Sequence, residues 1–413
     1  MNETMEAINS GDTAFVLVSA ALVLFMTPGL ALFYGGMVRR KNFLSVLMQC
    51  FILMCVITLQ WVLIGYSMAF GSDVGYGFVG GLEYIGLSGV GMAPQEGSTI
   101  PHLAFMIFQC MFAIITPALI VGAFAERIRF SSFLVFMLLW ATLVYDPVCH
   151  WVWGPDGWLG SMNALDFAGG TVVHINAGVS ALVMAILIGQ RKGYRKMPFT
   201  PHHLPFVVVG TAILWFGWFG FNAGSALAAD GAAANAFVTT TVSTAAAGLV
   251  WALIEWKNNG APTMLGAATG AVAGLVAITP ACGFVGPMAS IAIGAGSSAL
   301  GFVAVAILKP RLGYDDSLDV FGVHGIGGIW GALATGIFAQ ASIGGTDGLV
   351  FGNAGQLGIQ ALSVVATMAY SAVLTFVLYK AVDLVLGMRV AKEDEIVGLD
   401  ISQHREAGYT VLE

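Results

Sequence analysis

Charged side chains are scarce in this sequence. Asp, Glu, Lys and Arg make up only 9% of its 413 residues, while hydrophobic residues make up 58%. Ordinary soluble domains carry about 25% charged residues. So much apolar surface cannot be hidden in one soluble core, which excludes an ordinary soluble protein and indicates one that lies in a lipid bilayer. We draw nothing about charged partners from the net charge of −7, and nothing in the sequence supports nucleic-acid binding.

Cysteine motifs and the usual marks of an enzyme are also missing. The sequence shows no nucleophile–base pair, no phosphate-binding loop and no metal cluster. We therefore predict a protein that is not an enzyme and needs no cofactor or metal. The five cysteines lack CxxC spacing, and we interpret them as packing residues rather than disulfide partners or metal ligands. They are Cys50, Cys55, Cys110, Cys149 and Cys282.

Long apolar runs, by contrast, are abundant. A helix needs about 20 apolar residues to cross the hydrocarbon layer of a membrane. We therefore expect an all-α integral membrane protein, with a transmembrane domain over residues 1–388 and a cytoplasmic tail over residues 389–413. The eleven predicted transmembrane helices cover about 13–36, 43–70, 99–124, 131–152, 167–190, 203–227, 234–256, 262–280, 284–308, 319–340 and 357–388.

The basic residues predict the orientation of these helices. With eleven spans and an outside N-terminus, all 16 Lys and Arg residues fall on the inner side or at the inner end of the last span. The outer loops then carry none, as the positive-inside rule requires. We expect the topology to be N-out, C-in.

The first ten spans form two groups of five, over about 13–190 and 203–340, and the eleventh span follows at 357–388. An odd number of spans makes the second group enter the membrane from the opposite side, so we predict two inverted five-helix repeats plus a final helix. Such repeats place the functional site near the middle of the bilayer. An Asp-to-His pattern opens the fifth span of each group: Asp166 precedes His174, and Asp319 precedes His324.

Two histidines, His174 and His324, lie deep within apolar, glycine-rich runs. Ionisable residues inside a membrane are rare and mark a substrate or proton pathway by default. Because burial disfavours a charged imidazolium, we expect both rings to be mostly neutral, able to pass a proton or to accept a hydrogen bond from a small polar solute. A lone buried His is more often a packing residue, but two at equivalent repeat positions favour function. A metal pair is the rival interpretation, and no Cys, Glu or Asp lies one helical turn from either His to supply a third ligand.

Asp166 and Asp319 each begin a predicted span. A carboxylate in this position accepts hydrogen bonds from free backbone N–H groups and faces the positive end of the helix. We therefore predict that both residues are helix caps. An added electrostatic role stays open at Asp166, because burying a carboxylate in a membrane is costly.

Aromatic residues gather toward the outer side of the predicted bundle. Most aromatics near a membrane surface belong to the interfacial belt, and we interpret Trp151 and Trp158 in this way. A cage of aromatic faces can also hold a small cation. The pattern alone does not select such a cage from the remaining candidates, which are Phe108, Phe112, Trp153, Trp218 and Phe221.

Several sequence strings resemble the ammonium transporter family (Amt/Mep/Rh). The resemblance covers essentially the whole chain. The position of Trp153 and a bacterial-style tail favour the bacterial and archaeal Amt branch over the Rhesus branch. The strings begin at Ala123, Leu165, Gly217, Thr279 and Asp319, and read AFAERIR, LDFAGGTVVHIN, GWFGFNAGS, TPACG and DVFGVHG.

This resemblance implies a homotrimer in the cell (inner, cytoplasmic) membrane, with one pore per subunit. Trp153, Phe112 and Ser225 match the family's outer recruitment site, where aromatic faces and a hydroxyl receive ammonium. Asp166 matches the acidic residue that supports this site. The implied gate beneath it is formed by Phe112, Phe221 and Phe108. The implied pore residues are His174, His324 and Trp218.

The implied function is selective ammonium uptake. A dry pore lined by neutral histidines imposes a desolvation cost of several kcal/mol on any intact ion, and potassium cannot shed its charge. Ammonium can be deprotonated and cross as ammonia while its proton travels separately, so we predict electrogenic transport. A passive ammonia channel is the first alternative. The second is an ammonium sensor that signals through its tail, although only residues 389–413 follow the last span.

The tail resembles the family's segment that couples subunits and meets a PII-type signalling protein. Its matching parts are Gly387 to Val390, Glu395 to Asp400, and His404. The family's usual His-Gly-Glu is replaced here by His404-Arg405-Glu406, a departure that bears on the local turn and on the details of PII docking. We expect a PII-type protein to dock on the tail and on the basic loop from Arg191 to Lys196.

Overall fold

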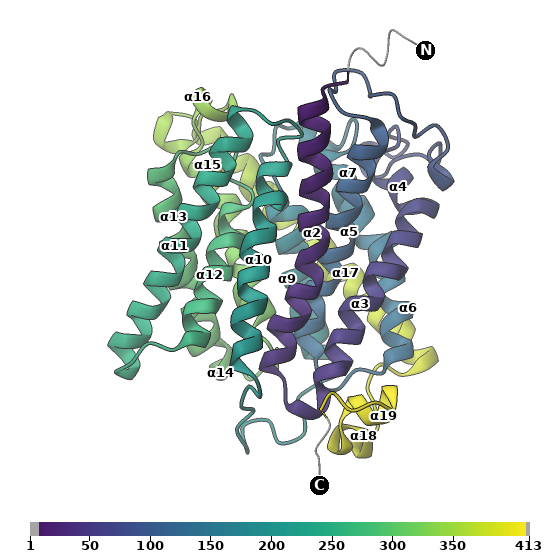
Figure 1. Cartoon of the computed structure of the whole chain (residues 1–413), viewed down its shortest axis with the longest axis vertical. Coiled ribbons are helices and arrows are strands. Elements are labelled where there is room, and N and C mark those ends of the chain that lie inside the picture. Colours follow the sequence, from purple (N-terminus) through teal and green to yellow (C-terminus); the bar gives the residue numbers. More distant parts are fainter. Residues whose placement is uncertain (1–7, 410–413) are drawn as a thin grey trace.

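The computed structural model describes residues 8–409. Within that range the chain is helical, with no β-strand and only three isolated backbone bridges, so the predicted fold class is confirmed. Ten helices are long and apolar enough to cross a membrane, and an eleventh apolar helix is shorter. They stand side by side in one bundle (Figure 1). Residues 1–7 of the predicted transmembrane domain and residues 410–413 of the predicted tail lie outside the described residues.

The helices follow the predicted spans in order. The first five crossings are α2 (Ser10–Met37), α3 with α4 (Phe43–Gln60, Tyr66–Phe70), α5 (His102–Phe124), α6 with α7 (Phe130–Trp140, Asp146–Trp153) and η5 with α9 (Gly170–Ile175, Asn176–Ile188). The next five are α10 (Leu204–Gly224), α11 (Gly231–Asn259), α12 (Met264–Ile278), α13 with α14 (Pro287–Phe302, Lys309–Leu312) and η7 with α15 (Phe321–Gly325, Ile326–Phe338). Last come α17 (Ala354–Leu386) and two short tail helices, α18 (Lys392–Val397) and α19 (Leu399–His404).

A built turn separates the seventh span from the eighth. α11 ends before Gly260, whose φ of 82° is a left-handed conformation that glycine adopts readily. The hydroxyl of Thr263 then caps α12 by accepting from Gly266 N at 2.9 Å. Glu255 ties the two helices together, since its carboxylate accepts from the backbone N–H and the hydroxyl of Thr263, each at 2.8 Å. The eighth span is 15 residues long, shorter than the predicted range 262–280.

Helix α5 forms the centre of the bundle. In its most apolar stretch 89% of the residues are buried, compared with 33% in α11 and in α17. The outer helices instead expose large apolar side chains, as expected where a helix faces lipid. Those between 60% and 63% exposed include Phe51, Leu59, Leu63, Leu249 and Val365. A site on α5 and its neighbours is therefore shielded from lipid.

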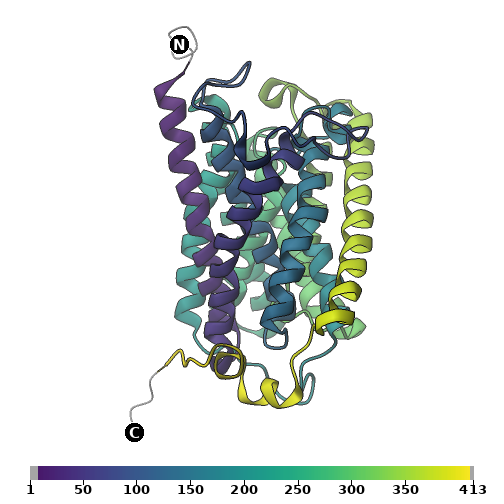
Figure 2. The same ribbon diagram turned by 90° about the vertical axis from the view of Figure 1, so that its right-hand side faces the viewer.

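The tail lies against the end of the bundle opposite the start of α2 (Figures 1 and 2). We call this the tail end and the opposite one the N-terminal end. Asp400 accepts from the backbone N–H groups of Leu44 and Ser45 at 3.1 and 2.8 Å, and so caps α3. In return, Asn42 Oδ1 accepts from Leu399 N at 2.8 Å, at the start of α19. The tail and the second span thus cap each other.

Ion pairs join the loops at the tail end. Arg191 makes a bidentate pair with Asp315, at 2.9 and 2.8 Å, and lies 3.5 Å from Glu126. Glu126 also pairs with Arg39 at 2.7 Å. Burial favours a higher pKa for Asp315, but the bonds from Arg191 and the charge of Arg127 hold that pKa below its ordinary value. Basic residues from three loops therefore meet at one end of the bundle, as the predicted orientation requires.

Candidate functional site

The two predicted pore histidines face each other inside the bundle. Their Nδ1 atoms are 3.3 Å apart, and the rings stack with centroids 5.3 Å apart. His174 is 1% exposed and His324 is 3% exposed. A hydrogen bond between two Nδ1 atoms requires one donor and one acceptor, so two neutral rings must take different tautomers. The pair is therefore built to share one proton position between its rings.

Close backbone packing brings the histidines together. His174 lies on η5 and His324 on η7, both wider π-helical turns, which are frequent at functional sites. A methyl group on Gly178 would lie 2.2 Å from Gly325 N, and one on Gly328 would lie 3.1 Å from His174 Cβ. Only glycine permits the first of these approaches, so the register of the two helices, and with it the pairing of the rings, depends on it.

The space beside the histidines is narrow and apolar. A cavity of about 10 Å³ touches both rings and is otherwise lined by aliphatic and aromatic side chains, among them Leu30, Leu119 and Val272. Its volume is close to the minimum of about 10–15 Å³ that holds one water. A hydrated ion does not fit, whereas one small neutral molecule does. Within residues 8–409 no three His, Cys, Asp or Glu side chains gather in a way that could hold a metal ion.

Trp218 completes the wall of this cavity. Its ring stacks on His174 with centroids 5.4 Å apart, and its Nε1 donates to the hydroxyl of Thr279 at 2.9 Å. The hydrogen bond fixes the plane of the indole, so its face rather than its polar edge meets the histidine. Trp218 therefore lines the small cavity beside the two histidines.

Two phenylalanines close the approach from the N-terminal end. The rings of Phe112 and Phe221 lie 4.2 Å apart, and each is 1% exposed. Phe221 also stacks toward His174 at 6.1 Å, while Phe108 meets Phe112 edge-on at 5.0 Å. Phe112 thus contacts both of the other predicted gate residues, and Phe221 links it to His174.

Trp153 lies beside Phe112, toward the N-terminal end of the bundle. Its ring meets Phe112 edge-on at 5.8 Å, and its Nε1 donates to the carbonyl oxygen of Asp166 at 2.8 Å. Ser225 follows α10 one turn after Phe221, and its hydroxyl donates to the carbonyl of Phe221 at 2.8 Å. Of the predicted recruitment residues, Trp153 thus contacts Phe112, and the Ser225 hydroxyl is held at the backbone of Phe221 with an oxygen able to accept a further hydrogen bond.

Asp166 is a helix cap, as predicted. Its carboxylate accepts from the backbone N–H groups of Gly169 and Thr171, each at 2.8 Å, and from Val172 at 3.2 Å. Burial raises the pKa of Asp166, while the hydrogen bond from the Thr171 side chain acts in the opposite direction. The carboxylate oxygens therefore point into the first turn of η5, and it is the backbone carbonyl of Asp166 that meets Trp153.

The prediction that Asp319 caps the tenth span is wrong. Its carboxylate pairs with Lys309 at 2.5 Å, and its φ is 62°. The cap is Asp316, whose Oδ2 accepts from Phe321 N at 2.8 Å. Asp316 precedes His324 by eight residues, the same spacing as between Asp166 and His174. The equal spacing could have identified Asp316 as the cap from the sequence alone. The family motif begins at Asp319, and the prediction followed that motif instead.

A second cavity continues from His324 toward the tail end. Its volume is about 40 Å³, and its lining includes Tyr34, Thr269 and Asp319. It is thus larger and more polar than the cavity between the histidines. The histidine pair stands between a closed aromatic approach on one side and a small polar space on the other, which is the arrangement of a narrow conducting path.

A bundle of apolar helices with such a path through its centre defines a multi-pass membrane transporter or channel rather than an enzyme. The chain belongs to the ammonium transporter family: the model described as "Ammonium Transporter Family" matches residues 14–409. It is 53% identical over 402 residues to the ammonium transporter of Bacillus subtilis, covering 97% of this chain and 98% of that one.

Solved structures agree with this assignment. Mep2 of Candida albicans is 36% identical, with a TM-score of 0.90 over 95% of this chain and 89% of that one. A protein titled "Sensor Amt Protein" is 28% identical, with a TM-score of 0.88 over 95% of this chain and 98% of that one. The chain is therefore similar both to a relative named as an ammonium transporter and to a solved structure titled as a sensor.

Proposed function

We propose that this protein takes up ammonium selectively across the cell (inner, cytoplasmic) membrane and that charge crosses with it. Membership of the ammonium transporter family supports the substrate. The observation that carries the mechanism is the hydrogen-bonded pair of His174 and His324 in a cavity too small for a hydrated ion. In this scheme ammonium is deprotonated, ammonia passes the pair, and the proton crosses separately.

Recruitment is the first step of the scheme. Ammonium binds between the aromatic faces of Trp153 and Phe112 by cation–π attraction, and donates a hydrogen bond to the hydroxyl of Ser225. Trp153 Nε1 donates to the backbone carbonyl of Asp166 and so ties the indole to this residue. The negative charge of the buried Asp166 carboxylate favours a cation beside the indole. The step concentrates the ion at the gate without yet removing all of its water.

Selection is the second step. Phe112 and Phe221 separate, and the substrate enters an apolar space in which an intact ion loses several kcal/mol of hydration. Ammonium escapes this penalty by giving its proton to the neutral histidine pair and crossing as ammonia, whereas potassium has no proton to give. The two Nδ1 atoms provide a donor and an acceptor in line, so a proton can move from ring to ring as their tautomers exchange.

The proposal also covers the arrangement of the whole chain in the membrane. Residues 1–388 form the transmembrane domain with two inverted repeats, and residues 389–413 form the cytoplasmic tail. The matching cap geometries of Asp166 and Asp316 support the repeats, and the basic loops beside the tail support an N-out, C-in orientation. We also propose a homotrimer with one pore per subunit, regulated by a PII-type protein at the tail end.

Two other functions remain as rivals to this proposal. A passive ammonia channel would use the same pore without moving a proton. An ammonium sensor is favoured by the likeness to a solved sensor of this fold, and would bind ammonium but signal through its tail. A measurement of net ammonium transport distinguishes the sensor, which would move none, from the other two functions.

Uptake by the purified protein in liposomes tests the proposal. Ammonium should accumulate faster in vesicles with the protein than in empty vesicles after an ammonium gradient is applied. A pH-sensitive dye inside the vesicles separates the two transport functions, because entry of ammonia alone raises the internal pH, whereas entry of ammonia with a proton leaves it nearly unchanged. A rate equal to that of empty vesicles, in a preparation that still binds ammonium, would favour the sensor.

A further inference from the structure

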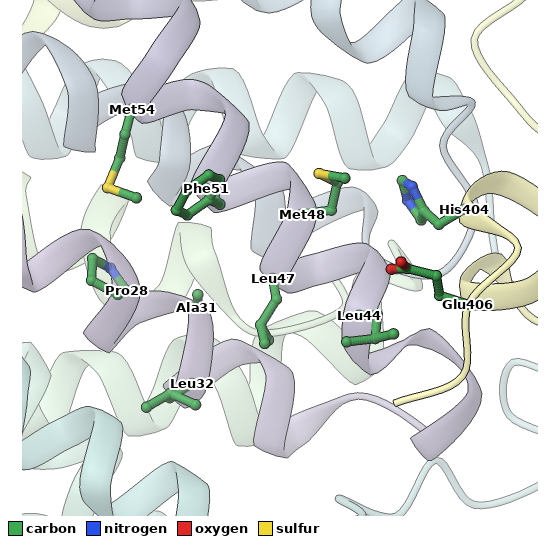
Figure 3. Close-up of a pocket in the computed structure, with 10 residues that line it drawn as sticks. All are labelled: Pro28, Ala31, Leu32, Leu44, Leu47, Met48, Phe51, Met54, His404 and Glu406. Carbon is green, nitrogen blue, oxygen red and sulfur yellow. The ribbon is translucent and has the colours of Figure 1, made fainter. Parts of the chain in front are cut away.

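The cavity that continues from His324 ends at an acidic residue. Its volume is about 40 Å³, and its lining includes Tyr34, Thr269 and Asp319. The side chain of Asp319 is 28% exposed, so its carboxylate lies where the cavity meets the surface at the tail end. The larger apolar pocket between α2 and α3 opens instead on the outer face of the bundle, where Phe51 is exposed (Figure 3). Asp319 therefore stands at the exit of the candidate path.

The backbone holds Asp319 in place at this exit. Ser317 N donates to the carbonyl of Ala123, near the end of α5, at 3.2 Å. Leu318 N donates to the carbonyl of Gly122, one residue earlier, at 3.1 Å. Asp319 itself has a φ of 62°, a left-handed conformation that Asp tolerates better than most residues. The turn that carries the carboxylate is thus anchored to the central helix of the bundle.

A lysine ammonium already binds this carboxylate. Lys309 Nζ lies 2.5 Å from Asp319 Oδ1, and the lysine side chain is 16% exposed. Lys309 begins α14, directly after the π-helical turn η6 (Val303–Leu308) of the ninth span. The side chain of lysine ends in a single positive charge with three N–H donors. The exit carboxylate is therefore occupied by a cation that belongs to the chain itself.

A second carboxylate gives the exit an excess of negative charge. Asp316 is 1% exposed, and the charges of Lys309 and Asp319 both act on it. Its Oδ2 accepts from Phe321 N, while its Oδ1 is buried without a hydrogen-bond partner in the part of the chain that the structure describes. When all three groups are ionised, two negative charges face one positive charge. Without the ammonium of Lys309, both carboxylates would attract a cation from the solution at the tail end.

We propose that Lys309 is a tethered cation that guards the exit of the pore against potassium from the tail side. Its ammonium occupies Asp319, so a potassium ion must displace a charge that the chain holds at a high effective concentration. Ammonia that leaves the histidine pair is neutral and passes without displacing Lys309. The inference rests on the proposed function and deepens it, because it names a residue that determines selectivity at the exit.

Ammonium currents in two salts test this role. The purified full-length protein is placed in supported membranes with equal potassium chloride or choline chloride on both sides, so that its orientation does not matter. Choline is larger than the exit cavity and serves as the reference cation. The wild type should carry the same ammonium current in both salts. In Lys309→Met the current should be about fivefold smaller in potassium than in choline, which corresponds to an ion pair worth about 1 kcal/mol.

Three further variants assign the effect to the ion pair. Lys309→Arg keeps the positive charge and should behave like the wild type. Asp319→Asn in the Lys309→Met background removes the acid that attracts potassium, and should bring the two currents close to each other again. Asn is suitable there because it also tolerates a left-handed φ. Lys257→Met, on the exposed end of α11, is the matched control and should leave the ratio of the two currents unchanged.

The results that overturn the proposal concern the ratio of the two currents. Equal currents in both salts for Lys309→Met would overturn it, and so would the same potassium effect in the wild type. A potassium effect that persists in the double variant would place the ion elsewhere and would also overturn it. Lys309→Gln removes the same charge and takes the place of Lys309→Met if that variant does not fold. A wild type without ammonium current in either salt would instead reject the proposed function, so the two failures are distinguishable.

Discussion

Asp146 is a buried acid in the fourth span, outside the candidate site. Gln60 Nε2 donates to its Oδ2 at 2.6 Å, whereas Gln60 Oε1 and Asp146 Oδ1 have no partner within residues 8–409. A carboxylate only accepts hydrogen bonds, but a protonated carboxyl or an amide can also donate one. An uncharged carboxyl or amide in this place brings the donor that a carboxylate lacks.

This geometry predicts opposite outcomes for two substitutions of Asp146. Asp146→Asn should leave stability nearly unchanged, because its amide can donate to Gln60 Oε1 and accept from Gln60 Nε2. Asp146→Ala should lower the free energy of unfolding by roughly 1–3 kcal/mol, since the buried Gln60 amide loses its bond to Asp146 and keeps only the hydroxyl of Thr142, at 3.2 Å. Thermal unfolding in detergent measures both. Equal effects of the two variants, or a further large loss from Gln60→Ala in the Asp146→Ala background, would contradict the pairing.

Trp153 allows a similar separation of roles. Trp153→Leu should weaken the apparent affinity for ammonium by about tenfold or less, because an exposed cation–π contact contributes roughly 0.5–1 kcal/mol. Trp153→Phe keeps an aromatic face but loses the bond to the Asp166 carbonyl, and should weaken affinity less. Concentration-dependent uptake measures the two values. Complete loss of uptake in a correctly folded Trp153→Leu variant would mean that the indole is structural.

The tenth span is capped by a residue that the sequence pattern did not identify. Asp316 caps η7 and is 1% exposed. Burial raises its pKa from 3.8 to about 6. A carboxyl with a raised pKa binds its proton more tightly in the folded state, so it contributes stability at low pH that is lost as the pH rises through the folded pKa.

This loss of stability with rising pH should be visible in the unfolding temperature. Between pH 4 and pH 6 the unfolding temperature of the wild type should fall with rising pH by more than that of Asp316→Asn, which cannot titrate. Asp347→Asn, on an exposed loop, is a suitable control because it should follow the wild type. The comparison uses differences between variants, so other titrating groups cancel. Parallel curves for the wild type and Asp316→Asn would show that Asp316 is not buried as described.

Individual helices show which parts of the fold and of the candidate site the sequence could predict. Apolar length predicted the eleven long helices in order, because membrane crossing imposes a strong and simple constraint, although the eighth, Met264–Ile278, is shorter than expected. The cap of the tenth span was missed, since an Asp that begins an apolar run does not reveal which backbone N–H groups its carboxylate meets. The contact between Phe112 and Phe221 comes from two distant helices, so spacing alone could not pair them; the family resemblance did.

Across the whole molecule, the tail connects segments that the membrane domain keeps apart. Asp400 caps α3, and the Glu395 carboxylate accepts from Arg389 at 2.8 Å and also from Lys192 N in the loop after α9. The loop is part of the predicted PII surface. A change in the tail would therefore reach the second span and that loop together.

Truncation tests this connection. Deleting residues 390–413 should impair uptake or abolish its control, because α3 loses its cap and the loop loses Glu395. Asp400→Ala should reproduce the effect in part, while Lys380→Ala, on an exposed face of α17, should not. A pull-down with the organism's own PII protein, with and without ATP and ADP, accompanies the uptake assays. No binding in any condition, together with unchanged uptake, would remove the proposed regulation.

The claim at the centre of this account is that ammonium carries charge through the histidine pair while potassium is excluded. The most direct measurement is the current across a supported membrane on a sudden addition of ammonium, with potassium as the control. The account predicts a current for ammonium, none for potassium, and loss of the selective ammonium current in His174→Ala and His324→Ala. Ammonia entry without any current in the wild type, or wild-type currents in both variants with potassium still excluded, would contradict it.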